Sequence, residues 1–168
     1  RGDKKELDMR NMPLGLVAMA GLLTCAPALA TGFDLTAGPS VTASERTTAA
    51  IFASVFGEQP GDNRTHFEPI GKLGWIDSRD TRKDDLDHEV FMAAGGVRIL
   101  AANHWFVSEQ LAATSTRTDA LSSRFEFMTS VGWQHGHFIV MLRHISNAHV
   151  VGGGKNLGET MLLGGVKF

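Results

Sequence analysis

The chain has 168 residues, of which 43% are hydrophobic, 8% aromatic and 20% charged. That length suits a single domain, and the charge density is too high for a bundle of membrane helices. A formal net charge of −2 excludes the basic field that collects nucleic acid, and a single cysteine excludes a disulfide framework or a cysteine-based zinc site.

The N-terminal residues have the pattern of an export signal. Residues 14–30 are uncharged and apolar, follow a basic residue and end in Ala-Leu-Ala, a small-residue cleavage pattern. A membrane-anchoring helix is the alternative, but the stretch is short for one and Pro27 interrupts it. We expect an N-terminal extension and signal peptide over residues 1–30 and one exported domain, free of cysteine, over residues 31–168.

The exported part alternates apolar and polar residues instead of showing helical stripes. In residues 124–133, RFEFMTSVGW, one face is mainly apolar and aromatic and the other mixes charges with small residues, and residues 65–76 and 88–99 repeat the scheme. A soluble sandwich could alternate in the same way, but the many glycines and alanines on the charged face suit a crowded barrel interior. The pattern predicts an all-β fold, an eight-stranded antiparallel transmembrane β-barrel in the outer membrane.

Eight strands can be placed in chain order. They are expected near residues 33–43, 47–56, 65–76, 88–100, 103–113, 122–133, 135–146 and 158–168.

The links between these strands fall into two classes. Short turns are expected at residues 101–102 and 134, and long polar links at 77–87, 114–121 and 147–157. If the first strand begins on the periplasmic side, the long links lie outside the cell, as in such barrels, although the 57–64 link is long for the periplasmic side. The chain ends in GGVKF, similar to the C-terminal strand signal of outer-membrane barrels.

The candidate catalytic residues lie in the last predicted hairpin. His144 and Ser146 are two residues apart, so both belong to the face of one strand that also holds apolar residues (Phe138, Val140 and Leu142). That face is expected to meet lipid, and an imidazole and a hydroxyl there belong at the headgroup boundary. The strand count puts this end of the strand at the outer leaflet.

A serine–histidine pair needs a third group to orient the histidine, usually a carboxylate. Glu159, at the start of the last strand, is the candidate, with backbone N–H groups around Asn147 and Ala148 as a candidate oxyanion hole. In an unbroken last strand with Phe168 towards lipid, Glu159 would point inward. A bulge at Gly164-Gly165 would turn it outward.

Residues 144–148, HISNA, followed by residues 156–159, NLGE, resemble the lipid A 3-O-deacylase (PagL) family. The resemblance is sharpest over about residues 131–168. Two positions depart from the family pattern. Glu159 directly follows Gly158, where the family usually spaces the acid differently, and His149 stands where the family tends to have glycine.

The resemblance implies an eight-stranded outer-membrane barrel that hydrolyses the ester-linked 3-hydroxyacyl chain at position 3 of lipid A without a metal or other cofactor. It implies His144 as base, Ser146 as nucleophile and Glu159 as triad acid. Asn147, Ala148 and Asn156 would serve the oxyanion hole or substrate binding.

The expected partners are lipid A or lipopolysaccharide and the outer membrane. Nucleic acid is not expected as a partner, and the sequence does not decide whether the protein forms a homodimer.

Three alternative functions remain. One is a non-catalytic small barrel with a structural or adhesive role, and another is an outer-membrane phospholipase or esterase of looser specificity. The weakest is a soluble periplasmic lipocalin-like binder.

Several other residues have simpler interpretations. His135 and His137 are interfacial instead of a metal pair, and Asp77–Asp87 is a solvated loop. Tryptophans 75, 105 and 133 are interfacial girdle residues. Charges expected to pair across the barrel interior are Glu68, Lys72, Arg98, Arg124, Glu126 and Arg143.

Overall fold

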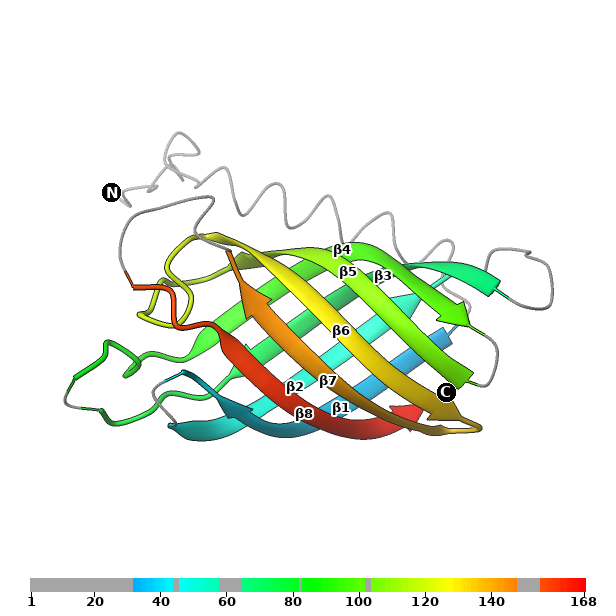
Figure 1. The fold of residues 1–168 in the computed structure, drawn as a ribbon, viewed down its shortest axis with the longest axis horizontal. Coiled ribbons are helices and arrows are strands. Elements are labelled where there is room, and N and C mark those ends of the chain that lie inside the picture. The colour runs from blue at the N-terminus through cyan, green and yellow to red at the C-terminus, as the bar shows by residue number, and fades with distance from the viewer. Residues whose placement is uncertain (1–31, 44–45, 58–64, 82, 102–103, 148–154) are drawn as a thin grey trace, which may run out of the picture.

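The structure, a computed structural model, is a closed barrel in which all eight strands are antiparallel to their neighbours (Figure 1). It describes residues 32–43, 46–57, 65–81, 83–101, 104–147 and 155–168. The expected signal segment therefore lies outside the described residues. The strands are β1 (Gly32–Val41), β2 (Thr47–Phe56), β3 (Thr65–Ile76), β4 (Val90–Ala101), β5 (Trp105–Thr114), β6 (Phe125–His135), β7 (Phe138–Ser146) and β8 (Glu159–Lys167).

Each strand pairs with the next in the chain, and β8 pairs back onto β1, so no described strand has an open edge. This confirms the predicted eight-stranded antiparallel barrel. Among the described residues, no helix has the length and hydropathy needed to span a membrane.

The two ends of the barrel differ as expected. The described residues of the long links 77–89, 115–124 and 147–158 gather at one end, which we call the loop end and which lies at the left of Figure 1. The opposite end, which we call the turn end, carries the last residue of β4, the first residue of β5 and the turn between β6 and β7. That last turn falls at Gly136 and His137, two residues later than expected, because glycine adopts the positive φ (57°) that a tight hairpin requires.

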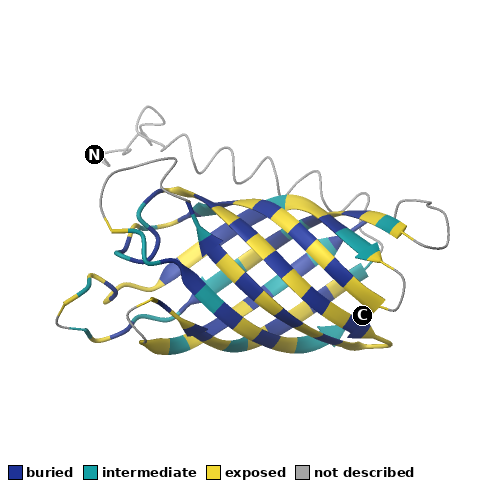
Figure 2. Ribbon diagram, in the orientation of Figure 1, coloured by how far each residue is buried: buried dark blue, intermediate teal, exposed yellow. Residues whose placement is uncertain are grey.

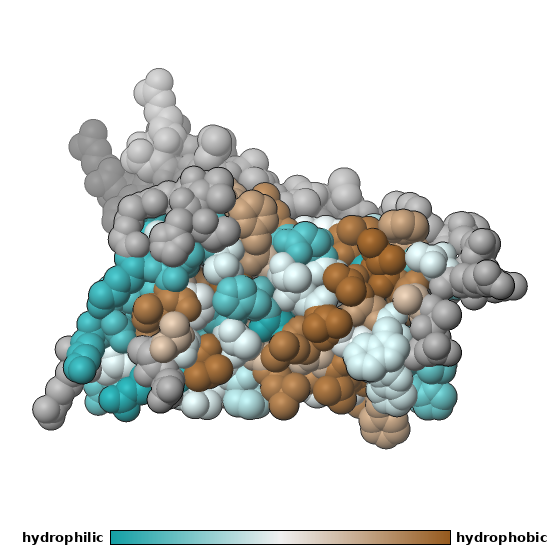
Figure 3. Space-filling view, in the orientation of Figure 1, coloured by the Kyte–Doolittle hydropathy of each residue, from teal (hydrophilic) through white to brown (hydrophobic). Residues whose placement is uncertain are grey.

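Exposure alternates along the strands, so that the barrel wall forms a chequered pattern (Figure 2). The exposed face of β6 holds Phe125, Phe127, Val131 and Trp133, as the alternation predicted. Hydrophobic residues gather over the middle of the visible wall, and hydrophilic residues gather at the loop end (Figure 3). An apolar outer surface with a partly charged interior is the arrangement of a barrel that faces lipid.

The interior combines charge with aromatic rings. Arg98 forms ion pairs with Glu68 (2.5 Å) and Asp34 (3.3 Å), and its guanidinium lies over the ring of Phe56, 4.3 Å from the centroid. Arg143 lies 4.2 Å from the ring centroid of Phe52. The two buried arginines therefore have opposite charges or aromatic faces beside them.

Five of the six charges expected inside are buried, namely Glu68, Lys72, Arg98, Glu126 and Arg143. Arg124 is exposed instead. It precedes the first residue of β6, so the alternation that points Glu126 inward does not yet apply to it.

Candidate active site

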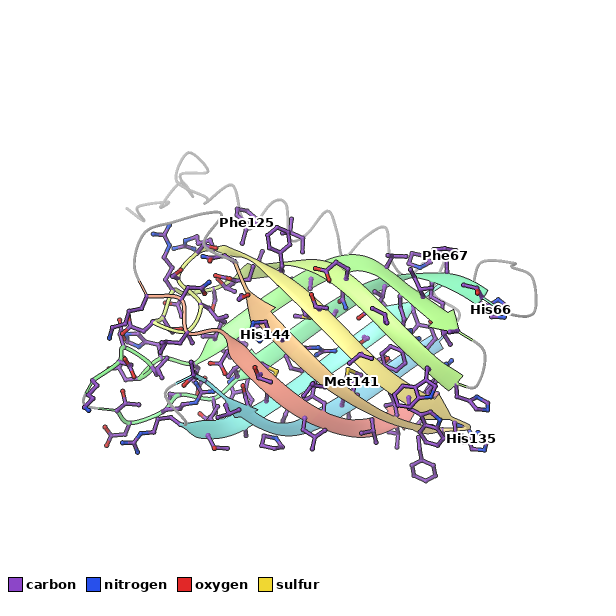
Figure 4. All side chains as sticks on the ribbon, viewed as in Figure 1. His66, Phe67, Phe125, His135, Met141 and His144 are labelled. Carbon is purple, nitrogen blue, oxygen red and sulfur yellow. The ribbon has the colours of Figure 1, made fainter. Side chains whose placement is uncertain are left out.

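The outer face of β7 carries the predicted histidine and serine in its last three residues. His144 lies on the part of β7 nearer the loop end (Figure 4). His144 is exposed and Ser146 half-buried, whereas Ile145 between them is fully buried. Two residues of strand separate their Cα atoms by about 6.7 Å, so the imidazole must lean along the strand for its ring to reach the hydroxyl. Both side chains leave the wall on the same side, as predicted.

Across the hairpin, His144 faces Thr160 of β8 in register. The His144 Nδ1 and Thr160 Oγ1 atoms are 3.0 Å apart, a hydrogen bond. In the tautomer that carries the proton on Nδ1, the imidazole donates to the threonine hydroxyl and Nε2 is free to accept a proton. That is the division of roles between the two nitrogens in a catalytic histidine.

Gly158 fits closely against the same imidazole. Its φ is +69°, and a Cβ atom placed on it would lie 2.8 Å from His144 Cε1 and 3.2 Å from Nε2. Any side chain at this position would therefore both strain the backbone and push the ring away. Glycine here allows the start of β8 to support the Nε2 edge of His144.

Glu159 does not lie beside His144. Its register partner is Ile145, and the residue is only 3% exposed, with its side chain inside the barrel. There the carboxylate accepts two hydrogen bonds from Arg79, at 2.7 and 2.6 Å, and a third from Ser40. The β7–β8 register runs without a bulge from Phe138 to Ile145, so the inward orientation expected for an unbroken strand is the one found.

The asparagines tie the neighbouring segments together. Asn147 is buried and donates from Nδ2 to Ser122 Oγ (2.9 Å), while its Oδ1 accepts a hydrogen bond from Asn156 Nδ2 (2.6 Å). The side chains of both residues therefore join the end of β7 to the start of β8 and to the 115–124 link. Ala148, expected to contribute to an oxyanion hole, lies outside the described residues.

The 115–124 link is a support for the site and not merely a solvated loop. The backbone N–H groups of Leu157 and Gly158 donate to the carbonyls of Asp119 and Ala120, each at 3.0 Å. Ala120 and the next residue, Leu121, are fully buried in the barrel mouth. The position of Gly158, and through it that of His144, depends on this link.

The 77–89 link also folds inward. Arg79 and Leu86 are buried, so the expectation of a solvated loop over Asp77–Asp87 is wrong for these two side chains. Arg79 is drawn in because Glu159 needs a counter-charge in the interior. Sequence alternation does not identify such a partner, because Arg79 comes from a link and not from a strand.

Lys155 joins the two links at the surface. Its ammonium group lies 2.9 Å from Asp84 Oδ1 and 3.0 Å from Asp119 Oδ2, and hydrogen bonds to these carboxylates raise the pKa of Lys155. The pairing holds the links and the start of β8 together.

Metal-ligating side chains gather elsewhere in the 77–89 link. Asp85, Asp87 and His88 are exposed and offer ligand atoms within 4.8 Å of one another, the one such group of three among the described residues. A hydrogen bond with Asp87 raises the pKa of the Asp85 carboxyl. Exposed acidic groups of this kind are common. Asp85 is also joined to the 115–124 link, because its backbone N–H donates to Asp119 Oδ2 (3.0 Å) and its carbonyl accepts from the Asp119 N–H (2.9 Å).

An apolar strip begins directly below the histidine on the same outer surface. Leu142 of β7 pairs in register with Leu162 of β8, and both are at least half exposed. Val140 and Phe138 continue the strip towards the turn end. An acyl chain lying along it would bring its carbonyl end towards His144 and Ser146.

Comparison with family models, with curated proteins and with solved structures found no match to the chain.

Proposed function

We propose that the protein is an outer-membrane ester hydrolase that removes the 3-hydroxyacyl chain from position 3 of lipid A. The observation that carries the proposal is the outward placement of His144 and Ser146 above an apolar strip, with His144 Nδ1 bonded to Thr160. The resemblance of HISNA and NLGE to the lipid A 3-O-deacylase family supplies the substrate. The apolar wall supports a position in the outer membrane, where lipid A resides.

In the proposed reaction Ser146 Oγ attacks the ester carbonyl while His144 Nε2 takes its proton. The imidazolium then returns that proton to the sugar 3-oxygen as the C–O bond breaks, which leaves the acyl group on Ser146. Water, deprotonated by His144, attacks the acyl-serine, releases the 3-hydroxy fatty acid and restores the serine hydroxyl. Each proton is thus returned within one cycle.

The proposal departs in one respect from the Ser-His-Glu triad that the resemblance implies. Thr160, not Glu159, is bonded to the histidine, so a neutral hydroxyl orients the ring. A hydroxyl fixes the tautomer but stabilises the imidazolium less than a carboxylate would. We therefore expect a modest rate for the chemical step.

A purified, detergent-refolded barrel tests this function directly. It is incubated with lipid A and, separately, with a diacyl phospholipid, and products are identified by mass spectrometry beside a Ser146→Ala variant. Release of 3-hydroxy fatty acid from lipid A by the wild type alone supports the proposal. Equal turnover of the phospholipid replaces it with a looser esterase.

A non-catalytic barrel is the second candidate, because Glu159 serves the interior ion pair instead of the histidine. No turnover of either ester by a correctly folded wild type, in several detergents, would favour it. Heat-dependent mobility in SDS gels, a property of folded barrels, provides the folding control.

A further inference from the structure

We propose that the turn end of the barrel holds a binding site for a late first-row divalent transition ion such as Cu²⁺ or Zn²⁺, formed by His104 and His135. These residues come from different hairpins. His104 directly precedes β5, and His135 ends β6, which pairs with β5. The site lies at the opposite end of the barrel from His144, as the labels in Figure 4 show for His135, and it is independent of the proposed esterase.

The distance between the two imidazoles fits shared coordination. His135 Nδ1 and His104 Nε2 are 3.3 Å apart, and the ring planes are inclined at 83°. Two imidazole nitrogens bound to one tetrahedral ion such as Zn²⁺ at about 2.0–2.1 Å each are about 3.3–3.4 Å apart. In neighbouring positions of the tetragonal geometry of Cu²⁺ they are about 2.8–3.0 Å apart, which a small rotation of the exposed rings supplies. The same 3.3 Å is long for a hydrogen bond between two rings. Imidazole is a preferred ligand of copper, zinc and nickel.

The backbone of His104 gives a second, independent argument. It has φ = 71°, and it is the one non-glycine residue with positive φ among the described residues. A left-handed conformation costs free energy for a residue with a Cβ atom, and such strain tends to persist where it serves a site. Here the conformation accompanies a ring that faces His135 across the strand pair.

Trp133 restrains the pair. Its ring stacks on that of His135, with centroids 5.7 Å apart and planes 19° apart, and meets the edge of His104 at 6.3 Å. Stacking limits the rotation of the His135 ring and so keeps Nδ1 directed at His104. Both histidines are exposed, which leaves the remaining coordination positions of an ion to water.

The neighbouring His137 is the natural comparison. It lies in the same turn as His135 and is also exposed, but its Nδ1 is bonded to the carbonyl oxygen of Lys167 (2.9 Å). The sequence spacing H-x-H suggests that His135 and His137 would be partners. The geometry pairs His135 with His104 instead.

The test is a titration of the folded barrel, without a polyhistidine tag, with CuCl₂ while tryptophan fluorescence is followed. Because Trp133 touches both rings, bound Cu²⁺ should quench its emission, with saturation at one ion per chain. His104→Asn and His135→Gln remove the ligands, and asparagine tolerates positive φ, so the backbone at 104 is preserved. Each should weaken binding at least about tenfold, whereas His137→Ala should leave it unchanged.

Electron paramagnetic resonance of the Cu²⁺ complex gives a readout that quenching alone does not. Two imidazole nitrogens should appear in the coordination sphere of the wild type and one in each ligand variant. Equal Cu²⁺ binding by the wild type, His104→Asn and His135→Gln would overturn the proposal. So would a loss in His137→Ala as large as in the other two.

Discussion

The two faces of the β7–β8 hairpin differ in the surroundings and the partners of their side chains. Its inner face holds Arg143 over an aromatic ring and Glu159 in an ion pair with Arg79. The outer face, one residue away along each strand, holds His144 bonded to Thr160. Adjacent residues of a strand therefore lie in separate environments, and the carboxylate of Glu159, which is close to the site in sequence, is bonded to Arg79 in the barrel interior.

The largest effect is expected at the proposed nucleophile. Ser146→Ala should lower lipid A hydrolysis by at least about 10³-fold, because no other group replaces the attacking oxygen. His144→Asn should do the same by removing the base. Hydrolysis rates of the purified variants are the measurement, and a Ser146→Ala protein that keeps more than about a tenth of the rate would remove the serine from the proposal.

Gly158→Ala should reduce kcat by about 10²-fold, because the new methyl group would displace the imidazole from its position. Gly136→Ala is the matched control. Gly136 also has positive φ, but a Cβ atom there would meet nothing within 4 Å. If both variants lost activity equally, backbone strain and not contact with His144 would be responsible.

Thr160→Val should lower kcat by about tenfold with little change in KM, since it removes one orienting hydrogen bond worth about 1–1.5 kcal/mol and keeps the shape. Thr160→Ser should restore most of the rate. An unchanged kcat in Thr160→Val would show that the hydroxyl does not position His144.

Glu159→Gln should change the hydrolysis rate by less than about twofold, because it acts inside the barrel. It should instead lower the free energy of unfolding by about 1–3 kcal/mol, because Arg79 loses its buried counter-charge. Urea unfolding followed by tryptophan fluorescence measures this. A drop in kcat larger than that of Thr160→Val, with stability preserved, would return Glu159 to the catalytic role.

The smallest effect, on the free energy of unfolding, is expected for Lys155→Met, because this substitution removes an exposed ion pair at the loop end. Contacts with Asp84 and Asp119 raise the pKa of Lys155, so its contribution to stability is complete at neutral pH. That contribution should disappear as the pH rises through the raised value. Unfolding midpoints of both proteins should therefore differ slightly at neutral pH and converge in strong alkali.

The strands could be predicted from the sequence because successive side chains of a strand point to opposite sides of the barrel wall, so apolar and polar residues alternate. The outer face of β7, including His144 and Ser146, follows from that alternation and was confirmed. The alternation did not decide whether Glu159 points into the barrel, because a bulge in the last strand would have turned it outward. The β7–β8 register has no bulge, so Glu159 points inward.

The partners of these residues could not be predicted in the same way. Thr160 could have been found from the register of a hairpin, but only once the length of the 147–158 link and the absence of a bulge were known. Arg79 reaches Glu159 from a link 80 residues away, where no period constrains the side chain. Phe52 and Phe56 lie inside although aromatic residues were expected outside, because buried arginines provide cations for their rings.

Mass spectrometry of lipid A from cells that make the wild type, Ser146→Ala or Glu159→Gln tests together the proposed nucleophile and the interior role of Glu159, because one experiment reads both faces of the hairpin. Lipid A should lose one 3-hydroxyacyl chain in cells with the wild type and with Glu159→Gln, and stay intact with Ser146→Ala, all three barrels being folded. Intact lipid A in every strain, or its deacylation in the Ser146→Ala strain, would contradict the proposed deacylation by Ser146.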